Sequence, residues 1–136
     1  MQAGMHQIGQ VAEAVGLSLR TIRHWEEVGL VLPSGRSAGG FRLYTDQDTA
    51  RLRLVKRMKP LDFTLEEMRE VLSLYDRLSC CSDPEDCSHA RARLEEYAVV
   101  AEERCQALRS QLDGAREIAR RLGAETGRPA AERGRR

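Results

Sequence analysis

The chain has 136 residues, 32% of them charged, and a formal net charge of +1, which suits one ordinary domain or a small domain with an extension. No apolar run approaches the roughly 20 residues that a bilayer span needs, so no membrane partner is expected. The first ten residues lack the pattern of a secretory signal, which predicts a cytoplasmic protein. Its four cysteines are then expected to be free, metal-bound or transiently oxidised.

Charge is unevenly distributed along the sequence. Residues 1–60 hold nine Arg/Lys against five Asp/Glu, residues 61–98 hold four against ten, and residues 99–136 hold nine against six. The net charges of the three segments are therefore +4, −6 and +3. A basic first segment indicates that this part alone meets a polyanion.

Residues 6–30 predict two short helices joined by a tight turn. Apolar residues recur at helical spacing up to Val15, and Gly16 supplies a helix stop. Ser18 suits the N-cap of the second helix, which Gly29 ends. This pattern is typical of a helix-turn-helix, although any small helical hairpin would also produce it.

Residues 30–45 predict a two-stranded hairpin, because apolar residues alternate there around a proline and several glycines. The tip of the hairpin is expected to carry Arg36 and Arg42. A basic hairpin directly after a helix-turn-helix is typical of a wing, which lies along phosphates or in a minor groove.

Helical spacing returns at Asp46 and ends at Pro60. One face of this helix is basic, with Arg51, Arg53, Lys56, Arg57 and Lys59. Thr64 and Glu67 then predict a capping box for the next helix. The expected buried stripe of that helix is Leu65, Met68, Val71, Leu72 and Tyr75.

From Pro84 the sequence predicts one long helix, for which Asp83 is a suitable N-cap. A heptad frame continues to Leu122, which makes a helix of 39 residues or about 58 Å. The frame begins at Arg91 and continues through Leu94, Ala98, Ala101, Cys105, Leu108, Leu112, Ala115, Ala119 and Leu122. So narrow an apolar stripe needs a partner helix, and a second copy is the simplest one, so the apolar positions predict a dimer seam.

In this order, the elements resemble the MerR family of bacterial transcription regulators. The resemblance rests on the stretch IGQVAEAVGLSLRTIRHWEEVGLV, on FTLEE at 63–67, and on Pro33, Arg36, Gly40, Phe41, Arg42 and Tyr44. It implies a mainly α fold, with a winged helix-turn-helix head, a small β-hairpin wing and a long dimerisation helix in an antiparallel coiled coil. The implied parts are a DNA-binding head at 1–78, a linker loop and dimerisation helix at 79–123, and a disordered basic tail at 124–136.

The resemblance also implies a function. A homodimer would bind a promoter operator in double-stranded DNA, distort that DNA and so act indirectly on RNA polymerase. The implied DNA-binding residues are Ser18, Arg20, Thr21, Arg23, Trp25, Arg36, Gly40, Phe41, Arg42, Tyr44, Lys56 and Lys59. Trp25 is equally compatible with a place in the core, and Phe41 is expected to support the sheet. No nucleophile–base pair or phosphate-binding loop is present in the sequence, so no enzyme is predicted.

Two residues depart from the family pattern. Gly39 stands where many members have Asn, which removes one expected wing contact. Asp62 stands where Gly is usual, at a position expected to have positive φ. The second departure puts the hinge at residues 60–62 in doubt.

The stretch CCSDPEDCSH at 80–89 concentrates cysteines. Cys80, Cys81, Cys87 and His89 are possible soft ligands, so zinc or another thiophilic metal is the one candidate cofactor. Residues 106–136 hold no Cys or His, so the two-site arrangement of the family's mercury and copper sensors is not carried over. Three interpretations stay open: inert or structural thiols, a metal site, or a thiol redox sensor.

The leading hypothesis is a sequence-specific DNA-binding regulator. An architectural winged-helix protein such as an excisionase is disfavoured, because those small proteins lack a long dimer helix. The other alternative is a cysteine-based metal-binding or redox sensor whose main output is not DNA binding. The intact set of Arg20, Arg23, Arg36 and Arg42 argues against it.

Overall fold

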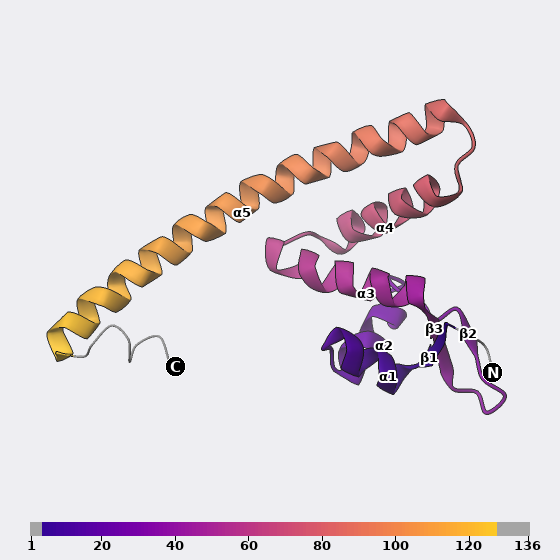
Figure 1. Cartoon of the computed structure of the whole chain (residues 1–136), viewed down its shortest axis with the longest axis horizontal. Helices are drawn as coiled ribbons and strands as arrows, with labels where there is room; N and C mark the ends of the chain where they lie inside the picture. Colours follow the sequence, from indigo (N-terminus) through magenta and orange to yellow (C-terminus); the bar gives the residue numbers. More distant parts are fainter. Residues whose placement is uncertain (1–3, 128–136) are drawn as a thin grey trace. The chain divides into compact units, whose positions relative to one another are not determined.

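The computed structural model describes residues 4–127 (Figure 1). In chain order the elements are β1 (Met5–Gln7), α1 (Ile8–Val15), α2 (Leu19–Glu27), β2 (Gly35–Arg36), β3 (Arg42–Thr45), α3 (Asp46–Met58), the 3-10 turn η1 (Lys59–Leu61), α4 (Leu65–Cys80) and α5 (Pro84–Thr126). The chain divides into two units, with the boundary between Leu94 and Glu95. The predicted fold class is confirmed: mainly helical, with a small sheet and a long final helix.

The sheet has three antiparallel strands in the order β1-β3-β2, one more than the predicted hairpin. The hairpin strands pair Gly35 with Leu43 and Arg36 with Arg42. On the other edge of β3, Met5 pairs with Thr45. The strand β1 was not predicted, because its three residues are too few to show the alternation that marks a strand. This strand joins the start of the chain to the wing.

The core of the first unit joins α1, α2, α3 and the sheet. Its largest fully buried side chains are Val11, Ile22, Val31, Tyr44, Leu52 and Val55. Burying an aliphatic side chain of this size contributes about 1.5–3 kcal/mol relative to leaving it in water. The helix-turn-helix and the wing are therefore held by one shared set of contacts.

Local chemistry at the helix ends matches the prediction. Gly16 closes α1 with a φ of 75°, and the Ser18 hydroxyl accepts a hydrogen bond from the Thr21 amide at 3.1 Å. The capping box of α4 is also present, because the Thr64 hydroxyl accepts from the Glu67 amide at 3.1 Å and the Glu67 carboxylate accepts from the Thr64 amide at 2.8 Å. The turn between α1 and α2 is thus encoded by residues next to it.

The buried face of α4 differs from the predicted stripe at both of its ends, and Leu65 is only half-buried. Met68, Val71 and Leu72 are buried as expected, but Leu74 is also buried and Tyr75 is 50% exposed. The prediction for Tyr75 is wrong, because the buried face continues from Val71 by a step of three residues rather than four. Tyr75 therefore presents its ring at the surface.

Within the first unit, α4 packs against the first turns of α5. The Arg93 guanidinium donates to both carboxylate oxygens of Glu70, at 3.0 and 2.9 Å, and Arg77 forms an ion pair with Asp86. At the start of α5 the Asp83 carboxylate accepts from the Glu85 amide at 3.2 Å, as expected of an N-cap. These contacts fix the turn between α4 and α5.

The second unit is the remainder of α5, a single helix in Figure 1. The whole of α5 has 43 residues, or about 65 Å at 1.5 Å per residue. It ends at Thr126, beyond the predicted boundary at 123, and residues 128–136 of the predicted tail lie outside the described residues. In the described part of the chain, no helix has both the length and the apolar character of a membrane span.

Candidate nucleic-acid interface

The exposed face of α2 carries a cluster of basic side chains. Arg20, Arg23 and His24 are exposed, and together with Glu27 they line a shallow surface depression. These residues are three and four positions apart, so they share one face of the helix. His24 was not among the predicted contacts, although its place four residues after Arg20 is a signal that would have found it. This face presents hydrogen-bond donors that suit base edges and phosphates.

Ser18 and Thr21, also predicted to contact DNA, are engaged at the start of α2. Their hydroxyl oxygens lie 2.8 Å apart, within hydrogen-bond distance, and the Ser18 hydroxyl also caps the helix. Ser18 is exposed and Thr21 is half-buried. Their evident role in the structure is to fix the first turn of α2, from which the basic residues project.

Two predicted contact residues lie in the core instead. Trp25 is buried, which favours the core alternative for this ring, and Tyr44 is fully buried. Among the described residues the Tyr44 hydroxyl has no hydrogen-bond partner. Its burial raises the pKa of Tyr44 above the ordinary value, with nearby Glu26 adding to the shift and Arg42 opposing it. Including Tyr44 in the exposed contact set is therefore corrected: its ring supports β3 from inside.

The wing tip, residues 37–41, is closed by short hydrogen bonds. The Ser37 amide donates to the Phe41 carbonyl at 2.8 Å, and the Gly40 amide donates to the Ser37 carbonyl at 2.9 Å. Gly40 has a φ of 82°, which favours glycine. The backbone conformation of the turn therefore accounts for the glycine at position 40.

Phe41 is placed differently from the expectation. It is 63% exposed at the tip, and so does not support the sheet from a buried position. A Cβ added at Gly39 would lie 3.0 Å from the Phe41 ring. An Asn at position 39 would therefore force the ring to move, which gives the departure at Gly39 a steric reason.

Both wing arginines contact Glu26, which projects from the last turn of α2. The Arg42 Nε donates to the Glu26 carboxylate at 2.5 Å, while the nearest Arg36 nitrogen lies 3.7 Å from it. Arg36 also donates to the Gly40 carbonyl at 3.0 Å. Glu26 was not predicted as part of the site, because its partners are distant in the chain and only the fold brings them together.

The basic face of α3 is divided between internal and exposed roles. Lys56 donates to the Val15 carbonyl at 2.8 Å and so caps the C-terminus of α1. Arg51 forms an ion pair with Asp76 of α4. Lys59, at the end of α3, is exposed. Of the two predicted lysine contacts, Lys56 is thus engaged within the first unit.

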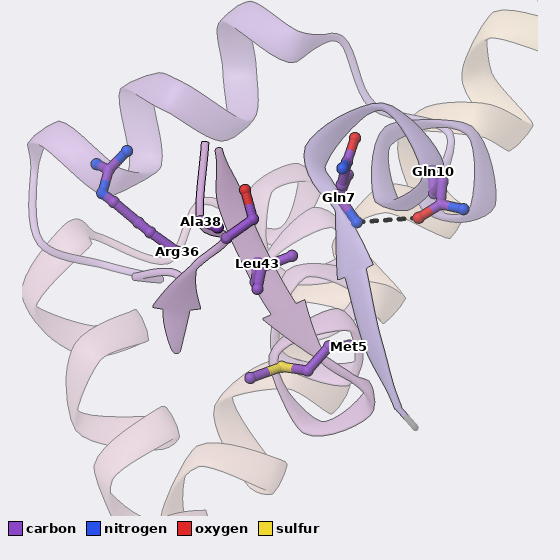
Figure 2. A pocket seen from close by; sticks show the side chains of 7 residues that line it. Met5, Gln7, Gln10, Arg36, Ala38 and Leu43 are labelled. Carbon is purple, nitrogen blue, oxygen red and sulfur yellow. Dashed lines mark hydrogen bonds between the residues drawn. The ribbon is translucent and has the colours of Figure 1, made fainter. Parts of the chain in front are cut away.

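A hollow lies between the start of α1 and the wing (Figure 2). It is lined by Met5, Gln7, Gln10, Arg36, Ser37, Ala38 and Leu43. The backbone amide of Gln7 donates to the side-chain oxygen of Gln10 at 3.0 Å. In Figure 2 the Arg36 side chain points away from both glutamines. The hollow thus separates a polar helix start from the wing strand.

The cysteines are not brought together as one set of ligands. Cys81, the C-cap of α4, forms a disulfide with Cys87 in α5, with a Cα–Cα distance of 6.0 Å. Cys80 and Cys105 are free and exposed, and His89 is exposed. Within residues 4–127, no group of three or more His, Cys, Asp or Glu is arranged to hold a metal ion. Two of the four candidate ligands are therefore paired with each other.

Aspartate 62 adopts the conformation expected at its position. Its φ is 59°, and it is the one non-glycine residue with positive φ among the described residues. It ends η1 with its amide donating to the Lys59 carbonyl at 3.0 Å. The hinge is thus formed with Asp in the left-handed region.

Comparison with known proteins agrees with this geometry. The chain matches the family models for the MerR HTH family regulatory protein over residues 7–74 and for MerR, DNA binding, over residues 49–122. It is 34% identical over 108 residues to the HTH-type transcriptional regulator ZntR of Escherichia coli K12, a match that covers 78% of this chain and 72% of ZntR. These matches define a DNA-binding regulator of the helix-turn-helix class.

A second relative is the heavy metal-dependent transcription regulator 2 of Rhizobium meliloti, 38% identical over 77 residues, or 56% of this chain. The chain spans about half the length of that relative, 52%. The fold is shared with the crystal structure of HiNmlR, which is described as a MerR family regulator lacking the sensor domain, bound to promoter DNA. That match has a TM-score of 0.65 and 20% sequence identity, and it covers 91% of this chain and 96% of HiNmlR. This chain belongs to the MerR family, which consists of transcriptional regulators and not enzymes.

Proposed function

We propose that this protein is a sequence-specific transcriptional regulator that reads an operator with α2 and the wing. The carrying observation is the exposed face of α2, where Arg20, Arg23 and His24 lie together on a helix held by the buried core. Arginine can donate two hydrogen bonds to guanine in the major groove. Arg36 and Lys59 are also exposed, and their charged side chains suit contacts to phosphates. The head in this proposal comprises residues 1–78.

We infer a homodimer from α5. Its predicted seam contains Leu108, Leu112 and Leu122, all exposed in the single chain. Leaving such side chains in water forgoes about 25 cal/mol for each Å² of apolar surface that a partner would cover. A second copy carries the same stripe, and an antiparallel pair of α5 helices would bury both, with residues 79–123 supplying the linker loop and the dimerisation helix.

A two-fold symmetric dimer reads a near-palindromic operator, because each head meets one half-site. We propose that this operator lies in a promoter, that the protein acts in the cytoplasm, and that binding distorts the DNA. The distortion would act on RNA polymerase indirectly, by changing the geometry of the promoter. The family assignment supports this inference.

Selection of DNA duplexes from a random pool tests the proposal. The wild-type protein should enrich a near-palindromic sequence and protect it from nuclease cleavage. Replacing Arg20 and Arg23 together by Ala should abolish the enrichment. The matched control replaces Arg109 and Arg116, two exposed arginines of α5, and should leave it intact. Selection of no sequence by the wild-type protein would overturn the proposed function.

A second candidate function, a thiol redox input to the same regulator, is favoured by the Cys81–Cys87 disulfide. The bond joins the C-cap of α4 to the first turn of α5, the junction between the head and the long helix. Forming it oxidises two thiols to one disulfide, releasing two protons and passing two electrons to an oxidant such as a peroxide. Reduction would remove this covalent link and leave the turn between the two helices held by the Arg77–Asp86 and Arg93–Glu70 pairs.

A thiophilic metal is the competing effector, because one relative is described as heavy metal-dependent. Native mass spectrometry of protein purified without chelator separates the two. The redox input predicts a mass that rises by two hydrogen atoms on reduction, because two protons and two electrons are added, and this change should depend on both Cys81 and Cys87 but not on Cys105. A stoichiometric metal that is lost from Cys81→Ser would overturn the redox input in favour of a metal sensor.

A further inference from the structure

Glu26 lies on α2, the proposed recognition helix, and faces the wing. It belongs to the last turn of α2, and its side chain is 18% exposed. Arg42 of β3 contacts one carboxylate oxygen at 2.5 Å, and Arg36 of β2 approaches the other at 3.7 Å. One carboxylate thus faces both strands of the wing.

The two arginines differ in how strongly they are engaged. The Arg42 side chain is 29% exposed and sits at charge-assisted hydrogen-bond distance from Glu26. The Arg36 side chain is 53% exposed, lies farther from the carboxylate and donates to the Gly40 carbonyl in the turn. A phosphate competing for these cations would therefore reach Arg36 more readily than Arg42.

An unpaired carboxylate beside a DNA-binding face repels phosphates. The presence of Glu26 beside this face is explained if its charge is neutralised by a cation of the protein itself. We propose that Glu26 is a positioning residue for DNA recognition, which ties Arg42 and the wing to α2 and leaves Arg36 as the phosphate contact. This inference rests on the proposed DNA-binding function.

The consequence is that the recognition helix and the wing meet DNA as one rigid body. The core fixes α2 through Ile22 and Trp25, and the Glu26–Arg42 pair transfers that placement to β3. Tyr44 holds β3 on the core, and the Glu26–Arg42 pair adds a direct link from α2 to the strand that carries the exposed wing tip. Arg42, which the sequence placed among the DNA contacts, acts in this proposal as part of the tether.

The test compares Glu26→Gln with Glu27→Gln. Both variants remove one negative charge from neighbouring positions at the end of α2, and Glu27 is exposed. The probes are the duplex that the wild-type protein selects from a random pool and a scrambled duplex of equal length. Glu26→Gln should lower the ratio of the two affinities about tenfold more than Glu27→Gln, because a charge-assisted hydrogen bond is lost.

Salt dependence gives a second readout that a merely structural role would not move. Freed from Glu26, Arg42 gains a phosphate, so the slope of log affinity against log salt should steepen by about 0.9 in Glu26→Gln. In an Arg42→Gln background the extra effect of Glu26→Gln should disappear. An extra effect that persists in that background would overturn the tether.

Hydrogen exchange without DNA separates failure of this inference from failure of DNA binding. The Gly40 and Ser37 amides, bonded within the wing, should exchange faster in Glu26→Gln and in Glu26→Asp, whose shorter side chain retracts from Arg42. Glu27→Gln should leave their rates unchanged. Equal rates in Glu26→Gln and Glu27→Gln, with matching thermal unfolding, would overturn the tether whether or not the protein selects a DNA sequence.

Discussion

The two units of the chain treat their apolar side chains in opposite ways. In the first unit, Ile22, Leu52 and Val55 are fully buried by the chain itself. In the second unit, Leu112 of the heptad frame is 48% exposed and Leu122 is more exposed still. The first unit therefore has its core within one chain, whereas the chain itself leaves the apolar stripe of α5 exposed, and the proposed dimer would cover it. Stability of the head and assembly of the protein should respond to different substitutions.

The largest expected effect concerns assembly. Leu112→Glu places a charge in the predicted seam, where a partner helix would bury it without a counter-charge, so the dimer should dissociate. Sedimentation velocity should show the change from dimer to monomer. The control is Val99→Glu, an exposed apolar residue outside the heptad frame, which should remain dimeric. A dimer that persists in Leu112→Glu would rule out the coiled-coil seam.

The second prediction concerns the core of the head. Leu52→Ala should lower the free energy of unfolding by about 2–5 kcal/mol, because a fully buried side chain is replaced by a cavity. Urea unfolding in the Leu112→Glu background measures this loss without a contribution from assembly. Leu112→Ala, a like truncation at an exposed position in the otherwise unchanged chain, should instead weaken the proposed dimer, so its loss of stability should shrink as the protein concentration is raised. A loss below 1 kcal/mol for Leu52→Ala would contradict a core contained in one chain.

The third prediction concerns the exposed surface of the head. Arg23→Ala should cost about 1–3 kcal/mol of binding at the selected duplex if Arg23 contacts a base, and less on random DNA. Fluorescence anisotropy at fixed salt measures both affinities. Unfolding of the head should be unchanged, because Arg23 is exposed. An equal loss on both duplexes would identify Arg23 as a phosphate contact only.

What the sequence predicted well is local. The hydrogen bonds of Gly16 and Ser18 reach amides and carbonyls within four residues, so the turn between α1 and α2 can be predicted from neighbouring residues in the sequence. The positive φ of Asp62 belongs to the same class, since the family pattern places Gly there. The long helix α5 was likewise predicted from one continuous stretch, while its heptad seam stays a prediction.

What the sequence did not predict depends on distant pairs. The strand β1 exists because Met5 pairs with Thr45, and Arg42 is engaged because the fold brings Glu26 to it. A tyrosine is compatible with either a surface contact or the core, and only the packing of the fold shows that the Tyr44 ring is buried. Residue type and spacing therefore identified the class of interface, while tertiary contacts decided which of its members are exposed.

The smallest expected effect is at the hinge after η1. Asp62 has a φ of 59°, where a side chain crowds the backbone and costs up to roughly 1–2 kcal/mol for an ordinary residue, though less for Asp. Asp62→Gly removes that strain but adds freedom to the unfolded chain, so the net gain in stability should be about 0.5 kcal/mol. Asp62→Ala keeps the crowding without the local hydrogen bonding of Asp, and should instead destabilise the head by about 1 kcal/mol. Thermal unfolding of the two variants in the monomeric Leu112→Glu background measures the pair. Because Asp62 is an exposed residue of the first unit, neither change should alter the dimer of the otherwise unchanged chain, and a change in assembly would contradict the separation of the two units.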